Sequence, residues 1–112
     1  MEPGSTMSAT IKVTLDATRM AGRPGYKNGV RPNHRIPGRR NEVFMGALYF
    51  KDREILKPGE SCVAEGKFII YSKDESLFVP GFCWEICEAS RLTGTAELVE
   101  VEKIQKMDRT DA

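Results

Sequence analysis

The chain has 112 residues, of which 40% are hydrophobic and 29% charged, and its net charge is +1. This length accommodates one domain with a modest core, and the composition excludes disordered, collagen-like and coiled-coil chains. No apolar run approaches the roughly 18–20 residues that cross a bilayer, so we expect no membrane contact.

The N-terminal residues lack the positive stretch and apolar run of a secretory signal. We expect residues 1–7 to be a disordered tail or a vector remnant, residues 8–103 to form the folded domain, and residues 104–112 to be a polar tail. The three cysteines are an odd number, which favours reduced thiols over a disulfide framework. Together these features predict a cytoplasmic protein.

The first predicted strands show the two-residue alternation of half-buried β-structure. Ile11, Val13 and Leu15 alternate with polar residues. Residues 43–50 form a second apolar run, which Gly46 interrupts, so we expect a bulge or a close backbone approach there.

The second half of the chain continues this pattern after a turn at residues 57–60, where proline and glycine stand side by side. The strand over residues 61–71 places its even-numbered residues on one face and its odd-numbered residues on the other. A polar turn follows at residues 72–76. In the next strand we expect one face to hold Phe82, Trp84 and Ile86, and the other to hold Cys83, Glu85 and Cys87.

The last strand, residues 92–101, returns after a short connection at residues 89–90, and Gly94 predicts a bend within it. Five or six short strands without a helix indicate a closed barrel or a sandwich. Closure would also remove exposed sheet edges.

Residues 19–40 interrupt the strands with four glycines and three prolines, so we expect a long loop with a short strand over residues 30–36. Residues 17–41 contain seven basic side chains and no acid, whereas the remainder carries a balance of −6. Basic side chains at this density bind phosphates, and the rings of Tyr26 and His34 predict stacking on bases. The alternative is a solvated loop whose charges balance the acidic remainder.

Motifs of catalysis are missing: the chain has no phosphate-binding glycine loop, dinucleotide fingerprint or nucleophile elbow, so we expect neither an enzyme nor a cofactor. His34, the single histidine, is predicted to lie on the surface among arginines. Cys83 and Cys87 are separated by about 13 Å along a strand, too far to share one zinc ion, so we expect no metal site.

Several segments resemble the C-terminal β-barrel, the third domain, of bacterial elongation factor Tu. Residues 28–33 resemble its Gly-Tyr-Arg-Pro-Gln stretch, and residues 57–60 resemble its Met-Pro-Gly-Asp turn. Residues 82–99 resemble its last hairpin, and the similarity runs from Ser8 to Val101. The matching hairpin positions are Trp84, Ile86, Glu88, Arg91 and Gly94.

This resemblance implies an all-β, six-stranded antiparallel closed β-barrel. The family's nucleotide-binding domain has no counterpart in the chain, so no nucleotide binding is implied. In the family the barrel helps to hold the T stem of aminoacyl-tRNA and also contacts protein partners. The positions that match tRNA contacts are Asn33, Met45, Glu88 and Ala89.

The sequence therefore predicts a non-catalytic module that binds RNA, tRNA included, or an acidic protein surface. In the alternative, the module does not bind RNA but mimics or competes with the elongation factor barrel for a protein partner. A third hypothesis is a homo-oligomer in which basic loops meet acidic hairpins. The predicted binding residues are Arg31, Asn33, Arg35, Arg39 and Arg40 on the basic loop, and Glu88 and Arg91 on the hairpin.

Overall fold

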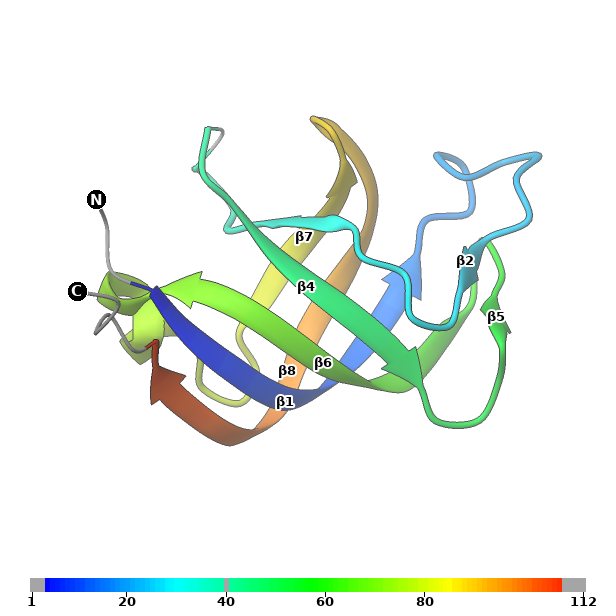
Figure 1. Cartoon of the computed structure of the whole chain (residues 1–112). Helices are drawn as coiled ribbons and strands as arrows, with labels where there is room; N and C mark the ends of the chain where they lie inside the picture. Colours follow the sequence, from blue (N-terminus) through cyan, green and yellow to red (C-terminus); the bar gives the residue numbers. More distant parts are fainter. Residues whose placement is uncertain (1–3, 40, 108–112) are drawn as a thin grey trace.

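The computed structural model describes residues 4–39 and 41–107 and shows a closed barrel of six antiparallel strands (Figure 1). This confirms the predicted fold class. Around the barrel the strands follow the order β1 (Gly4–Leu15), β6 (Ser61–Tyr71), β4 (Val43–Phe50), β3 (Asn33–Arg35), β7 (Cys83–Glu88) and β8 (Arg91–Lys106).

Two small elements accompany the barrel. A two-stranded sheet pairs β2 (Tyr26–Lys27) with β5 (Ile55–Leu56) at one end, which the sequence did not predict. The predicted polar turn after β6 is a short 3-10 helix, η1 (Ser72–Leu77). No helix in the described ranges has the length and apolar character needed to cross a membrane.

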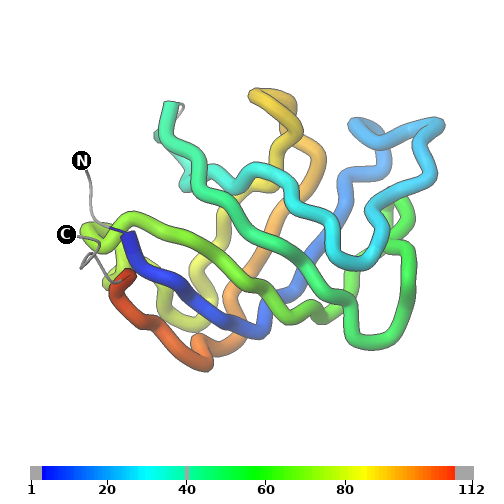
Figure 2. The backbone as a smooth tube through the Cα atoms, viewed as in Figure 1, coloured from blue at the N-terminus to red at the C-terminus, as the bar shows by residue number. Residues whose placement is uncertain are grey.

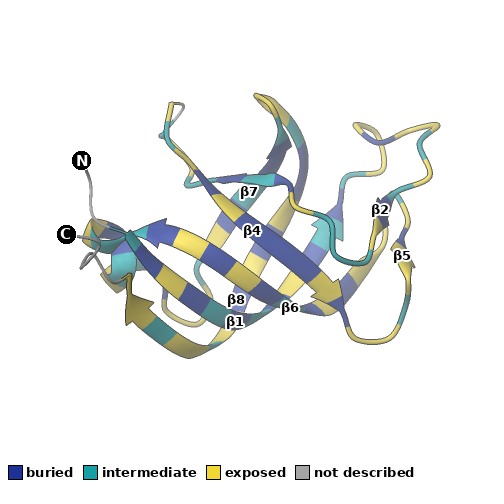
Figure 3. Ribbon diagram, in the orientation of Figure 1, coloured by how far each residue is buried: buried dark blue, intermediate teal, exposed yellow. Residues whose placement is uncertain are grey.

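Alternate burial along the strands builds the core, as Figure 3 shows for β1, β4 and β6. The even-numbered residues of β6 share one face, as predicted, and this face is the buried one, while Ile11, Val13 and Leu15 of β1 are fully buried. The turn before β6 also forms as predicted, with Gly59 at a φ of 85°. Burial of the inward apolar side chains stabilises each of these strands in the barrel.

Aromatic rings fill the centre of the barrel. The Trp84 ring lies 5.6 Å from Phe68, 5.8 Å from Phe44 and 5.5 Å from Phe78, measured between centroids. Phe68 lies directly against Gly46 and Gly66, because a Cβ atom at either glycine would stand 2.1 Å from a carbon of its ring. The close approach predicted at Gly46 is therefore present, and its partner is an aromatic side chain.

Both ends of the chain contribute more strand than the sequence predicted. Residues 4–7 belong to β1 instead of a disordered tail: Ser5 is buried and bonds to Ser72 and Glu75. β8 reaches Lys106, so the predicted polar tail begins as strand. These polar residues are ordered because β1 pairs with β6 on one side and with β8 on the other. Residues 1–3 and 108–112 lie outside the described residues.

The predicted faces of β7 are wrong at one residue because the strand contains a bulge. The sequence predicts Cys87 on the face of Cys83, opposite Ile86, but Cys87 and Ile86 are both completely buried. The pairing of β7 with β8 shifts register between Ile86 and Cys87, which turns both side chains inward. At Gly94 the sequence predicted a bend. There β8 passes so close to β1 that a Cβ atom would lie 2.4 Å from the carbonyl oxygen of Thr14.

Three connections extend from the same side of the barrel in Figure 2: residues 16–25, residues 36–39 with 41–42, and the turn between β7 and β8. In that turn Glu88 pairs with Arg91 across the two central residues Ala89 and Ser90. Ala89 has a φ of 54°, and no other described residue except glycine has a positive φ.

Replacing Ala89 with glycine is expected to stabilise the protein by about 0.5–1 kcal/mol. The left-handed backbone conformation costs an L-residue about 1–2 kcal/mol, which glycine avoids, but glycine loses more backbone entropy on folding and this offsets part of the benefit. Urea unfolding measures the change. Ser90→Gly is the matched control, since Ser90 has no positive φ and glycine there should not stabilise. Equal effects of the two substitutions would contradict the explanation.

Candidate binding surface

β3 carries the centre of the predicted site, and its alternation divides the site in two. Asn33 and Arg35 lie on its outward face, while His34 points into the barrel and is fully buried. The indole Nε1–H of Trp84 donates to His34 Nδ1 at 3.0 Å, and His34 Nε2 lies 3.2 Å from the carbonyl oxygen of Gly46. Nδ1 is thus the acceptor and Nε2–H the donor, which defines a neutral imidazole. Burial lowers the pKa of His34 to about 4.

The prediction that the rings of Tyr26 and His34 stack on bases is therefore wrong. His34 is a core residue because strand alternation, not the surrounding charge, decides its direction. Tyr26 is buried as well, and its hydroxyl shares a 2.7 Å hydrogen bond with Thr93. Burial raises the pKa of Tyr26 to about 12.

Three arginines of the basic segment form ion pairs with acids far along the chain, on β7 and η1. Arg23 holds Glu88 through two hydrogen bonds of 2.9 and 2.7 Å, which lower the pKa of Glu88. Arg35 Nε lies 2.8 Å from Glu85 Oε1. Arg39 Nη1 lies 2.7 Å from the buried carboxylate of Asp74. Much of the local positive charge is thereby balanced, as the alternative interpretation of the loop expected.

The predicted binding residues do not form one cluster. Arg35 and Arg39 border a polar hollow of about 600 Å³ beside Ser90 of the hairpin turn. Glu88 and Arg91 lie at the turn itself. Asn33 is placed between its register partners, Met45 on β4 and Cys87 on β7. Arg40 lies outside the described residues, and Arg31 belongs to a different surface.

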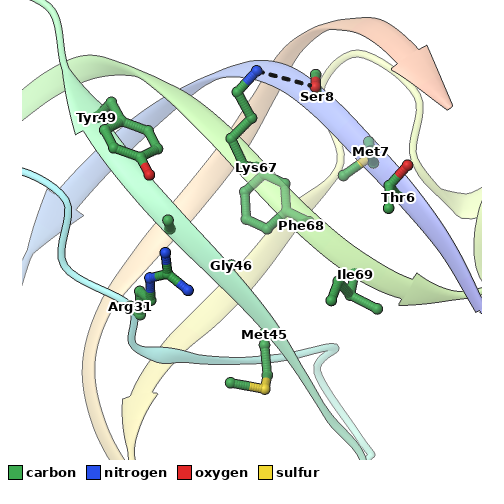
Figure 4. Close-up of a pocket in the computed structure, with 11 residues that line it drawn as sticks. Thr6, Met7, Ser8, Arg31, Met45, Gly46, Tyr49, Lys67, Phe68 and Ile69 are labelled. Atoms are coloured by element: carbon green, nitrogen blue, oxygen red, sulfur yellow. Dashed lines mark hydrogen bonds between the residues drawn. The ribbon is translucent and has the colours of Figure 1, made fainter.

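Arg31 borders a groove of about 340 Å³ on the outward face of β4, β6 and β1, shown in Figure 4. Across β4 from Arg31 stands Lys67 of β6, whose register partners are Ala47 and Ser8. Lys67 Nζ lies 3.5 Å from the hydroxyl of Ser8. Within the described residues, neither Arg31 nor Lys67 forms an ion pair, and no acidic side chain lines the groove.

Apolar side chains surround these two cations. Met45 and Ile69 are direct partners across β4 and β6, with exposed fractions of 57% and 49%. Tyr49 is 40% exposed, and its ring lies on the same side of β4 (Figure 4). We name Arg31, Met45, Tyr49, Lys67 and Ile69 the groove face.

Sequence reasoning identified Arg31 and placed Met45 at a position that matches a tRNA contact of the resembled family, but it missed Tyr49, Lys67 and Ile69 as binding residues. Ile69 and Lys67 fall on the odd-numbered face of β6, but Val63 on the same face is about as exposed as Ile69, so an apolar residue there does not by itself indicate a site. Lys67 and Ile69 lie on the same surface as Arg31 only because of the strand register, which cannot be read from the sequence.

No protein-family model matches the chain, and no curated protein is similar to it. The resemblance to the elongation factor Tu barrel remains a prediction that rests on the short motifs. Across residues 4–39 and 41–107, no three His, Cys, Asp or Glu side chains gather in a way that could hold a metal ion.

Proposed function

We propose that this protein is a non-catalytic protein-binding module whose partner docks on the groove face. The observation that carries the proposal is the cluster of exposed apolar side chains, Met45, Tyr49 and Ile69, around two cations that form no ion pair with any residue the structure describes. Methionine, tyrosine and arginine are enriched in protein–protein interfaces, and contiguous apolar patches mark such sites.

The ion pairs of the basic segment favour a protein partner over RNA. RNA binding draws its affinity from many cations that can approach phosphates, and its interfaces are more polar and more positive than those between proteins. Arg23, Arg35 and Arg39 already bind acids of the same chain. A groove with an apolar rim and two remaining cations suits a partner that supplies both apolar and acidic groups.

Two further features support this proposal. The only histidine is neutral and enclosed in the core, which leaves it without access to a substrate. The cysteines Cys62, Cys83 and Cys87 are free thiols, which supports a reducing compartment such as the cytoplasm. The sequence motifs support a free-standing homologue of the elongation factor barrel that meets a protein of the translation apparatus.

Photo-cross-linking tests where the partner binds and what it is. Tyr49 is replaced by p-benzoylphenylalanine, and irradiated cells that produce the protein should yield adducts that protease degrades and nuclease does not. The same residue at position 79 is the matched control, because Val79 is exposed on a loop away from the groove face. Nuclease-sensitive adducts would identify RNA instead, and equal adducts at both positions would contradict docking on this face.

Replacing Met45 and Ile69 together with serine is expected to weaken partner binding by about tenfold or more, since loss of central apolar contacts costs about 1–2 kcal/mol each in typical interfaces. Both side chains are exposed, so the fold should persist, and circular dichroism checks this. Val79→Ser provides the control for loss of an exposed apolar side chain. Unchanged binding of the cross-linked partner to the double variant would contradict the proposal.

A further inference from the structure

The groove exists because a short side chain lies among long ones. Ala47 lies between Met45 and Tyr49 along β4 and opposite Lys67 on β6. It is only 6% exposed, although its register directs it outward, because the longer side chains around it stand above it. The floor is therefore apolar, and the walls carry both apolar and cationic groups.

Two cations border this floor. The Arg31 guanidinium and the Tyr49 hydroxyl point toward the space over β4 in Figure 4, whereas the Lys67 ammonium turns toward Ser8 of β1, 3.5 Å away. Glu65 and Glu102 lie close enough to Lys67 to feel its charge, but neither forms an ion pair with it in the described part of the chain, and each has another partner. Glu65 lies 3.8 Å from Lys51, and Glu102 accepts a hydrogen bond of 2.8 Å from Thr10.

We propose that the groove holds an acidic–apolar peptide segment of the partner, with one carboxylate of an Asp or Glu between Arg31 and Lys67 and an adjacent apolar side chain on Ala47. The inference rests on the proposed function and names the chemistry that this surface recognises. The guanidinium of Arg31 donates to the carboxylate, and the flexible Lys67 side chain exchanges its exposed contact with Ser8 for the bound anion. Met45 and Ile69 cover the apolar neighbour.

A carboxylate fits this site better than a phosphate does. Phosphate sites in proteins commonly use free backbone N–H groups, such as those of a helix N-terminus or a glycine loop. The backbone of β4, β6 and β1 beneath the groove is engaged in strand pairing. Only side chains remain to bind the anion, and the planar guanidinium of Arg31 can hold a carboxylate through two parallel N–H groups.

Selection from a library of short random peptides, displayed on phage and panned on the intact protein, tests this chemistry. Enriched peptides should share Asp or Glu beside Leu, Ile, Met or Phe. A synthetic peptide of the enriched sequence should bind at least tenfold more weakly when its acid is changed to the corresponding amide, a loss of about 1.4 kcal/mol.

The variant Arg31→Gln/Lys67→Gln should lose binding of the same peptide by about tenfold or more. Arg19→Gln/Lys27→Gln removes two exposed cations outside the groove and should leave binding within about twofold, apart from weak long-range screening effects. Added salt should weaken binding to the wild type more than binding to the groove variant.

Peptides without acids, failure to enrich any peptide, or equal binding by the two double variants would overturn the inference. These results leave the cross-linking at position 49 intact, so a different partner chemistry on the same face would be recognised. Conversely, loss of the position-49 adducts with retained peptide binding would contradict the proposed function alone.

Discussion

Acidification from pH 6.5 to pH 4 is expected to lower the free energy of unfolding by as much as about 3 kcal/mol through His34 alone, because each unit of pKa difference is worth about 1.4 kcal/mol. Burial keeps His34 neutral in the folded barrel, where Nδ1 accepts from Trp84 and no room exists for a proton there. In the unfolded chain the same side chain takes up a proton near pH 6.5.

The sign follows from proton uptake. Between the two pKa values the unfolded state binds more protons than the folded state, so stability is fully present above pH 6.5 and falls as the pH falls toward 4. Carboxylates in ion pairs, such as Glu88, have lowered pKa values, and their contribution is lost at more acidic pH.

Urea unfolding of the wild type and of His34→Gln across this pH range isolates the effect. Glutamine does not titrate and keeps an amide donor for the carbonyl oxygen of Gly46. The variant should be less stable at pH 6.5 and should lose less stability than the wild type on acidification. Parallel pH profiles of the two proteins would contradict a neutral, buried histidine.

The fold could be predicted from the sequence because its strands obey one simple rule. Residues 61–71 alternate without exception, so inward and outward faces are defined by position alone, and the same holds for Ile11 to Leu15. His34 escaped prediction because β3 has only three residues, too few to show a period. Residues 4–7 escaped because their order depends on strands far along the chain.

The candidate site was less predictable because it depends on contacts between distant segments. Arg23 and Glu88 are 65 residues apart, and Arg35 and Glu85 are 50 apart, so the composition of the loop does not show that its charges are balanced. Lys67 and Arg31 line the same groove only because of the register of β4 with β6. Sequence alone identifies cations, whereas the barrel decides which of them remain without ion pairs.

Gly46→Ala is expected to destabilise the barrel by about 3 kcal/mol, the upper part of the usual cost of overpacking a core. The new methyl group would stand 2.1 Å from Cδ1 of Phe68. The ring cannot retreat, since its centroid lies 5.1 Å from that of His34 and 5.6 Å from that of Trp84. Gly66→Ala should act similarly, because its Cβ would meet the opposite edge of the same ring.

A double-mutant cycle with Phe68→Leu tests whether the ring is the cause. Leucine lacks the rigid plane that covers Gly46, so Gly46→Ala should cost at least about 1 kcal/mol less in the Phe68→Leu background than in the wild type, a coupling typical of residues in contact.

Gly38→Ala is the control. Gly38 has a φ of 89° and open space around it, so alanine there adds backbone strain of about 1–2 kcal/mol without a clash. Its cost should be the same with Phe68 or with leucine at that position. Additive costs for Gly46→Ala and Phe68→Leu would mean that the backbone of β4, and not the aromatic ring above it, requires the glycine.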